Sequence, residues 1–211
     1  MSEAQGFNAK IAAELVSLTY RQLIHWDETG LIKPSIKGAS GRGSRRIYAF
    51  EDLVELRVVA MLRKAGVSLQ AVRRAVRYLH QNSGLLRPLA QLRFITDGTR
   101  IFVLTENPEA LLDATANSQL TFTLAVGQIV EELQRQVVAI RAPQTISIRL
   151  RGKTYEAELT PDLEAGGFTI AVPDLPGCFS EANSLREART MAREAIQGWL
   201  AATESGRAAA R

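Results

Sequence analysis

The stretch TYRQLIHWDETGLIKP, residues 19–34, decides how the first third of the chain folds. Thr19 is a favourable N-cap residue, and Gln22 stands three positions later, which is the spacing of a capping box. Gly30 is a residue type that commonly ends a helix. The stretch therefore predicts a short helix that Thr19 opens and Gly30 stops.

Other short elements are predicted on both sides of this helix. Asn8 caps a preceding helix that runs through residue 15, and a turn separates the two helices. Residues 33–46 hold five basic residues, three glycines and no acidic residue, which predicts a loop or a short two-stranded wing. A third helix is expected over residues 50–65, and Ser68 caps a fourth.

The positive charge of the chain lies in the same region. Residues 1–91 carry 14 Lys/Arg against 7 Asp/Glu, a net charge of +7, whereas the whole chain has a net charge of +4. Residues 92–142 have a net charge of −2 and residues 143–211 of −1. A polyanionic partner is therefore expected to bind the N-terminal third.

A capped helix next to a basic loop suits double-stranded DNA. The major groove admits one helix, and side chains from the first turn of that helix reach base edges. Tyr20, Arg21 and Gln22 occupy this turn, and Arg can read guanine while Gln can read adenine. The basic wing would contact the phosphates beside the groove.

Several separate motifs make residues 7–80 resemble the MerR-type winged helix-turn-helix. They are the stretch quoted above, the later RRIYAFEDLVELRVVAMLRKAGVSLQAVRRAV, and the spacing between them. In that family a Gly-Leu-Ile-Lys-Pro segment follows the recognition helix, and an Arg-x-Tyr element, here Arg46 and Tyr48, closes the wing. The resemblance implies a DNA-binding regulator and, after this domain, a homodimerisation helix.

The recognition helix departs from the family pattern in one place. Residues 23–26 read Leu-Ile-His-Trp where the family usually has Leu-Arg-Tyr-Tyr, so one expected phosphate contact is lost. His25 then has two interpretations, a phosphate ligand or a helix-packing residue. The candidate DNA contacts are Thr19, Tyr20, Arg21, Gln22, His25, Lys37, Arg42, Arg45, Arg46 and Tyr48.

The middle segment combines a hairpin with a helix. Residues 92–104 predict a hairpin that turns at Asp97-Gly98, and a helix follows over residues 124–140. Five apolar residues of this helix follow a heptad spacing: Val126, Val130, Leu133, Val137 and Ile140. They predict either a homodimer seam or a face that packs on the preceding hairpin, and we favour the seam.

The last segment changes to the alternation typical of strands. Three runs alternate apolar and polar residues, around residues 146–150, 155–159 and 168–172, with turns at Arg151-Gly152 and Gly166-Gly167. Ser184 and Glu187 have the spacing of another capping box, and an amphipathic helix follows them. This pattern predicts a small antiparallel sheet covered by one helix.

Residues 146–202 resemble the HicB-like antitoxin domain. The match lies in YEAELTPDLEAGGFTIAVPDLPGCFSEANSLREARTMAREAIQGWL, although Ala182 and Arg186 stand where the family usually has Gly and Glu. The resemblance implies a degenerate ribonuclease H-like fold. It also implies a partner, a small basic toxin of the HicA type or another kind, which the domain inhibits while the protein represses its own operon.

Nuclease activity in this segment is disfavoured. Two-metal phosphoryl chemistry needs several converging carboxylates, but Glu156 and Glu158 alternate with apolar positions on the solvent face of a strand. Asp162 and Asp174 fall in turn signals. Cys178, the single cysteine, has no neighbouring histidine to activate it and is expected to be a buried structural thiol.

The sequence therefore predicts an α+β protein with four parts. These are a winged helix-turn-helix domain (1–85), a dimerisation segment of hairpin and helix (88–142), a HicB-like sheet domain (143–203) and a tail (204–211). No run is long and apolar enough for a membrane helix, and the lone cysteine fits a reducing compartment, so a cytoplasmic location is expected. Neither a metal nor a cofactor is implied.

Two functions fit these parts. The first is a DNA-binding transcriptional regulator that serves as the antitoxin and autoregulator of a toxin–antitoxin pair, with operator DNA and a toxin as partners. The second is a MerR-type regulator whose C-terminal domain senses a small ligand, with no toxin involved. An enzyme is not expected.

Overall fold

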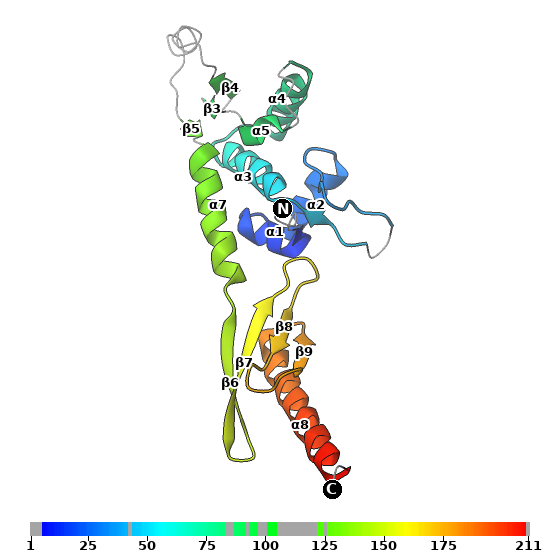
Figure 1. The fold of residues 1–211 in the computed structure, drawn as a ribbon. Helices are drawn as coiled ribbons and strands as arrows, with labels where there is room; N and C mark the ends of the chain where they lie inside the picture. The colour runs from blue at the N-terminus through cyan, green and yellow to red at the C-terminus, as the bar shows by residue number, and fades with distance from the viewer. Residues whose placement is uncertain are drawn as a thin grey trace. The chain divides into compact units, whose positions relative to one another are not determined.

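The computed structural model describes residues 6–41, 44–82, 87–91, 93–96, 101–104, 122–124 and 126–209 (Figure 1). The chain divides into two compact units, Met1–Val137 and Val138–Arg211, which are described separately. The predicted α+β class is confirmed, because unit 1 begins with helix-turn-helix elements and unit 2 is an antiparallel sheet with one long helix.

Unit 1 opens with a short strand and two short helices. These are β1 (Phe7–Asn8), α1 (Ala9–Leu15) and α2 (Tyr20–Glu28). Asn8 caps α1 as predicted, because its Oδ1 accepts hydrogen bonds from the backbone N–H groups of Lys10 and Ile11 at 3.0 and 3.1 Å. Gly30 follows α2 with a φ of 68°, a left-handed conformation that lets the chain turn away from the helix.

A second strand and two longer helices complete the helix-turn-helix fold. They are β2 (Ile47–Tyr48), α3 (Phe50–Lys64) and α4 (Leu69–Asn82). β2 pairs antiparallel with β1, and Ser68 caps α4 through a 3.1 Å hydrogen bond from the N–H of Ala71. The core between these elements contains Leu23, Trp26, Tyr48, Leu53, Leu56, Val59, Leu62 and Val72.

The middle of the chain adds one short helix and three short strands. They are α5 (Pro88–Gln91), β3 (Arg93–Thr96), β4 (Ile101–Leu104) and β5 (Phe122–Leu124), in the sheet order β4-β3-β5. The predicted hairpin is confirmed by the β3–β4 pairing, whereas its predicted turn at Asp97-Gly98 lies outside the described residues. The sequence did not predict β5.

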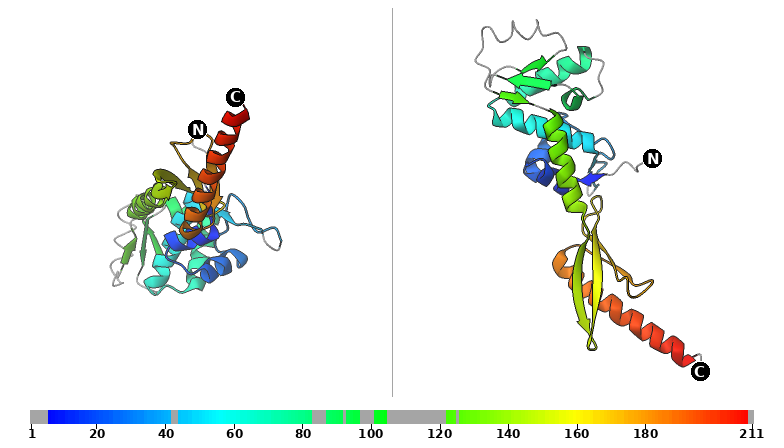
Figure 2. Two further views of the ribbon diagram at one scale, coloured as in Figure 1. Left: turned by 90° about the horizontal axis from the view of Figure 1, so that it is seen from below. Right: turned by 60° about the vertical axis from the view of Figure 1, so that its left-hand side comes forward.

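Helix α7 (Val126–Arg141) packs one face inside unit 1. Figures 1 and 2 show it beside α3, and an ion pair of 3.1 Å joins Arg57 of α3 to Glu132 of α7. Its buried residues are Val126, Ile129, Leu133 and Val137. Three of the five predicted seam residues are therefore buried within one chain, while Val130 and Ile140 are only half-buried.

Unit 2 is a four-stranded antiparallel sheet followed by a long helix. Its elements are β6 (Gln144–Leu150), β7 (Lys153–Pro161), β8 (Phe168–Ala171), β9 (Phe179–Ala182) and α8 (Leu185–Ala209), with the strands in chain order. The first three strands match the predicted runs, and β9 was not predicted. Arg151 and Gly152 make the predicted turn between β6 and β7, with φ values of 49° and 80°.

One face of this sheet forms the core of unit 2. Alternate residues of the strands, such as Tyr155, Ala157 and Leu159, are buried beneath α8, which contributes Ala188, Ala192 and Ile196. Leu185, in the first turn of α8, is 46% exposed.

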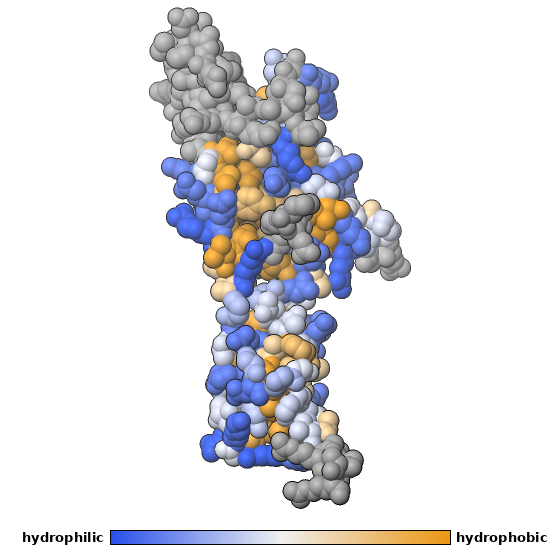
Figure 3. Space-filling view, viewed as in Figure 1, coloured by the Kyte–Doolittle hydropathy of each residue, from blue (hydrophilic) through white to orange (hydrophobic). Residues whose placement is uncertain are grey.

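The surface of both units is mixed in character. On the face seen in Figure 3, hydrophilic side chains surround smaller apolar areas. Within the described ranges, no helix is both long and apolar enough to cross a membrane.

Candidate nucleic-acid interface

The first turn of α2 is fixed by a capping box and faces solvent. The N–H of Gln22 donates to Thr19 Oγ1 at 3.2 Å, and Gln22 Oε1 accepts from the N–H of Thr19 at 2.9 Å. Leu23 and Trp26 anchor the opposite side of the helix in the core. Tyr20, which is 56% exposed, and the exposed Arg21 therefore project from a rigid turn. Because the carboxamide oxygen of Gln22 serves the cap, we expect Gln22 to position the turn rather than read a base.

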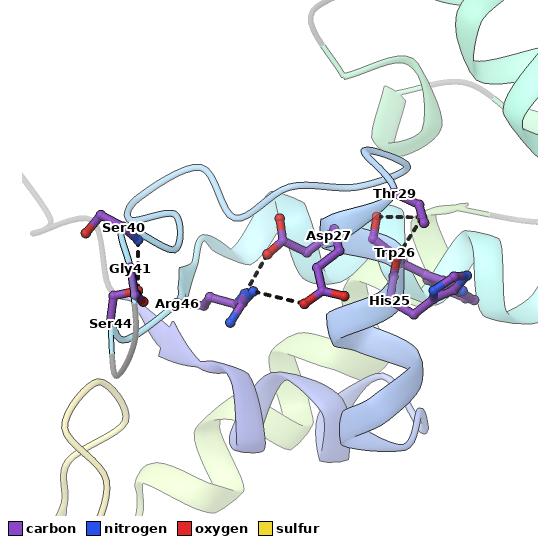
Figure 4. Close-up of polar contacts among 9 residues, drawn as sticks. His25, Trp26, Asp27, Thr29, Ser40, Gly41, Ser44 and Arg46 are labelled. Carbon is purple, nitrogen blue, oxygen red and sulfur yellow. Dashed lines mark hydrogen bonds and ion pairs between the residues drawn. The ribbon is translucent and has the colours of Figure 1, made fainter.

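His25 lies one turn further along α2 and is exposed. Its backbone carbonyl accepts hydrogen bonds from the N–H and the Oγ1 of Thr29, at 3.0 and 2.6 Å, which close the end of the helix (Figure 4). Exposure of the imidazole favours the phosphate-ligand interpretation over the helix-packing one. Among the described residues there is no group of three or more His, Cys, Asp or Glu side chains that could hold a metal ion.

The basic wing, residues 33–46, is a loop closed at its base by one β-bridge. The backbones of Lys37 and Ile47 exchange hydrogen bonds of 3.1 and 2.9 Å. Towards its tip, the N–H of Ser40 donates to Ser44 Oγ at 2.8 Å, and this hydroxyl donates to the carbonyl of Gly41 (Figure 4). Lys37 and Arg45 are exposed on the wing, as a phosphate contact requires, whereas Arg42 lies outside the described residues.

Arg46 makes an internal ion pair. Its Nε lies 2.5 Å from Asp27 Oδ2 and its Nη2 lies 3.9 Å from Glu28 Oε1, so it reaches from the end of the wing to the end of α2 (Figure 4). Its side chain is 16% exposed, and the hydrogen bond to Asp27 raises the pKa of the guanidinium. Arg46 thus links the end of the wing to the end of α2, and its contact with DNA stays a prediction.

Tyr48 has no surface to offer to DNA. The pairing of β2 with β1 turns its side chain into the core, where it is 0% exposed. Burial raises the pKa of its phenol far above the ordinary value, and its hydroxyl has no hydrogen-bond partner among the described residues. The expected contact between Tyr48 and DNA is therefore corrected: Tyr48 fills the core beneath the wing.

A second basic surface on α4 escaped the sequence prediction. Arg74 and Arg77 are exposed and lie three residues apart, on one side of the helix. The neighbouring Arg73 donates to Thr29 Oγ1 at 2.5 Å, which ties this part of α4 to the end of α2. The charge pattern of the sequence indicated this basic surface, because residues 56–96 contain eight Lys/Arg and no Asp or Glu.

Unit 2 exposes carboxylates on the open face of its sheet. Glu156, Glu158 and Glu181 are all exposed, and Ser147 Oγ donates to Glu156 at 2.8 Å. Asp162 stabilises the turn that follows β7, since its Oδ1 accepts hydrogen bonds from the N–H groups of Glu164 and Ala165 at 2.9 and 2.7 Å. Among the residues that the structure describes, no three such groups are placed to hold a metal ion.

Cys178 lies on the covered side of this sheet. It is 4% exposed, and burial raises the pKa of its thiol. The expectation of a buried structural thiol is confirmed.

The fold and this surface define the class of the N-terminal unit. A capped helix with an exposed first turn is followed by a basic wing and two further helices. This is the arrangement of a winged helix-turn-helix domain.

Comparisons with known proteins agree with this class and extend it to unit 2. Residues 7–79 match the model of the MerR HTH family of regulatory proteins, and residues 155–210 match the model of the HicB-like antitoxin of bacterial toxin–antitoxin systems. Both matches agree with the resemblances seen in the sequence.

Similar proteins occur in mycobacteria. Proteins of Mycobacterium bovis and of two strains of Mycobacterium tuberculosis, each named an uncharacterized HTH-type transcriptional regulator, are 36% identical to this chain over 131 residues. The alignment covers 62% of this chain and 57% of each relative, so the chain matches little more than half of their length.

Proposed function

We propose that this chain is a sequence-specific, cytoplasmic DNA-binding transcriptional regulator without enzymatic activity. The observation that carries the proposal is the capped, exposed first turn of α2 beside a wing whose exposed charged residues are all basic among those described. The match of residues 7–79 to the MerR HTH family of regulatory proteins supports the same function.

The proposed interface assigns different tasks to different residues. Arg21, with Tyr20 beside it, enters the major groove and contacts a base edge. Lys37 and Arg45 of the wing bind phosphates, which gives affinity without sequence information. The α4 surface, Arg74 and Arg77, supplies further phosphate contacts next to the end of α2. Thr19 and Gln22 hold the first turn of α2 in the geometry that this contact needs.

The protein is proposed to bind its operator as a homodimer. Each recognition helix would then reach one half-site of a palindrome. Val130 and Ile140 remain half-buried on α7, and Val138 is 69% exposed, so this helix still offers apolar surface to a second copy.

For unit 2 we propose the antitoxin role. The HicB-like match supports a toxin as partner, and the acidic sheet face, defined by Glu156, Glu158 and Glu181, has the charge that complements a small basic protein. The protein would then bind its toxin and repress the operon that encodes both.

Recovery of bound DNA from the native host tests the DNA-binding part. Cross-linking, immunoprecipitation and sequencing should enrich a small number of sites that share a palindromic motif, including the region upstream of the gene itself. Uniform recovery across the genome would leave only non-specific binding and would contradict the regulator function.

Co-purification tests the antitoxin part. The tagged full-length chain should retain the product of a neighbouring gene, and the variant Glu156→Lys/Glu158→Lys should lose it. Arg189→Glu, which changes an exposed charge on α8, serves as the control that should keep it. If no neighbouring product is retained and a metabolite instead raises the unfolding temperature, the ligand-sensor function replaces the antitoxin role.

A further inference from the structure

The carboxylate of Asp52 accepts hydrogen bonds from three separate segments of unit 1. It lies in the first turn of α3 and is 1% exposed. Its Oδ2 accepts hydrogen bonds from the N–H of Ala49, the N–H of Ser35 and the Oγ of Ser35, each at 2.8 Å. Its Oδ1 accepts from Arg87 Nη1 at 2.5 Å. The beginning of the wing, the beginning of α3 and the residue before α5 therefore meet at one buried charge.

Arg87 supplies the positive charge that this arrangement needs. A buried carboxylate without a partner is strongly unfavourable, so the position of Asp52 depends on the paired cation. Arg87 Nη1 also lies 3.7 Å from Glu55 Oε2, and its side chain is 26% exposed. Burial lowers the pKa of Arg87, but the hydrogen bond to Asp52 and the negative charges of Asp52, Glu55 and Glu51 together outweigh this effect, so the pKa is raised.

The two ends of the wing are held in the same way. Asp52 binds Ser35 at the beginning of the wing, and Asp27 binds Arg46 at its end. The exposed Lys37 and Arg45 lie between these two anchors. Their position relative to α2 therefore depends on two carboxylates, neither of which needs to touch DNA.

We propose that Asp52 and Arg87 are positioning residues for DNA binding, and that the segment beginning at Arg87 controls the wing through Asp52. The proposal rests on the proposed DNA-binding function and adds a route by which it is regulated. When Arg87 moves away, Asp52 loses its counter-charge and turns towards water. This movement weakens the bonds to Ser35, and the wing loses the position that brings Lys37 and Arg45 to the phosphates.

The experiment removes the charge of Arg87 in the full-length protein. Arg87→Met keeps the apolar stem, and Arg87→Lys restores a positive charge for Asp52. Each variant is tested for binding to a duplex that spans the region upstream of its own gene. Mobility of the wing is recorded, without DNA, from a spin label on Gly38→Cys. Gly38 suits this purpose because an added Cβ meets nothing within 4 Å, and Cys178 is too buried to take the label.

Arg87→Met is expected to weaken DNA binding on the order of tenfold and to lower the salt dependence by about two phosphate contacts. The label should move faster in this variant, and Arg87→Lys should recover most of both properties. Ser35→Ala removes one donor to Asp52 at an exposed position, so it should stay folded and shift both readouts in the same direction. If Arg87→Met does not fold, DNA binding and wing mobility of Ser35→Ala test the proposal instead. Arg193→Met, an exposed α8 residue, is the control for charge loss and should change neither.

The outcomes separate this inference from the function on which it rests. A folded Arg87→Met variant, or Ser35→Ala, that binds DNA as tightly as the unmodified chain and keeps a rigid wing would overturn the inference alone. An unmodified chain that binds no DNA would overturn the proposed function and this inference with it.

Discussion

Arg21 carries the sequence specificity in the proposed interface, because it is exposed in the first turn of the recognition helix. Replacing it with Ala should cost about 1–3 kcal/mol of binding free energy on the cognate site. A titration against cognate and random-sequence duplexes measures this difference. The loss should be much smaller on random DNA, and an equal loss on both would show that Arg21 touches phosphate instead.

Arg45 provides the matched comparison on the wing. As a phosphate contact, Arg45→Ala should weaken binding to both duplexes alike and lower the slope of log affinity against log salt by about one. The contrast between Arg21 and Arg45 therefore distinguishes base reading from phosphate binding.

Glu55 gives unit 1 a defined dependence on pH. It is 8% exposed, and burial raises its pKa from 4.5 to about 7; Arg87 opposes this rise and Asp52 adds to it. A carboxyl with a raised pKa favours the folded state while it is neutral. Its contribution to stability is fully present below pH 4.5 and is lost as the pH rises through about 7.

Glu55→Gln should remove this dependence, because the amide stays neutral. The free energy of unfolding of the variant should rise relative to that of the unmodified protein as the pH increases from about 5 to about 7.5. Urea unfolding followed by Trp26 fluorescence, in a Trp199→Phe background, measures this for unit 1. A constant difference across the range would mean that Glu55 is already charged at low pH.

Local chemistry explains which single residues were predictable from the sequence. Asn8 and Thr19 cap helices that begin immediately after them, and the capping bonds join residues at most three positions apart. Arg46 and Tyr48 were assigned to DNA from their place in the wing, whereas their surroundings in the fold depend on residues distant in the sequence. Asp27 lies 19 residues from Arg46, and no periodic pattern in the sequence predicts the ion pair between them.

At the scale of an element, the turn before β8 depends on one glycine. Gly167 has a φ of 89°, and a Cβ there would lie 2.3 Å from the carbonyl oxygen of Ala182 and 3.1 Å from the Cα of Asn183. Gly152 has a similar φ of 80°, but an added Cβ would meet nothing within 4 Å. The two positions thus share the same backbone strain and differ only in the clash.

Gly152→Ala should cost about 1–2 kcal/mol of stability, from the left-handed conformation alone. Gly167→Ala should cost about 1–3 kcal/mol more, because β9 must move away from β8. Thermal unfolding followed by Trp199 fluorescence compares the two variants. Equal destabilisation would mean that β9 yields to the added methyl group without cost.

The elements missed in the sequence were short ones or ones fixed by long-range pairing. β5 has only three residues, and β9 has apolar residues only at its two ends, so it shows no alternation. The capping box of α8 was found, with one difference: Glu187 accepts from the N–H of Asn183 rather than from that of Ser184. The hydroxyl of Ser184 still accepts from the N–H of Glu187 at 3.2 Å, so the helix begins where predicted.

At the scale of the whole molecule, the predicted homodimer depends on contacts between two copies of the chain. Leu133 is 1% exposed inside unit 1, so a charge at this position would unfold the unit before it tested an interface. Ile140→Glu is the sharper variant, because Ile140 is only half-buried. It should shift the protein towards the monomer in light scattering while its unfolding temperature stays nearly unchanged. An unchanged mass would place the dimer contact elsewhere.

The central claim is that unit 1 binds double-stranded DNA through α2 and the surrounding basic residues, and the salt dependence of DNA binding tests it most directly. With phosphate contacts from Lys37, Arg45, Arg74 and Arg77, the affinity of the full-length protein for the region upstream of its gene should fall about a hundredfold between about 50 and about 200 mM salt. Replacing Arg74 and Arg77 together with Ala should lower the slope by about two. An affinity that is flat across this range would contradict the account.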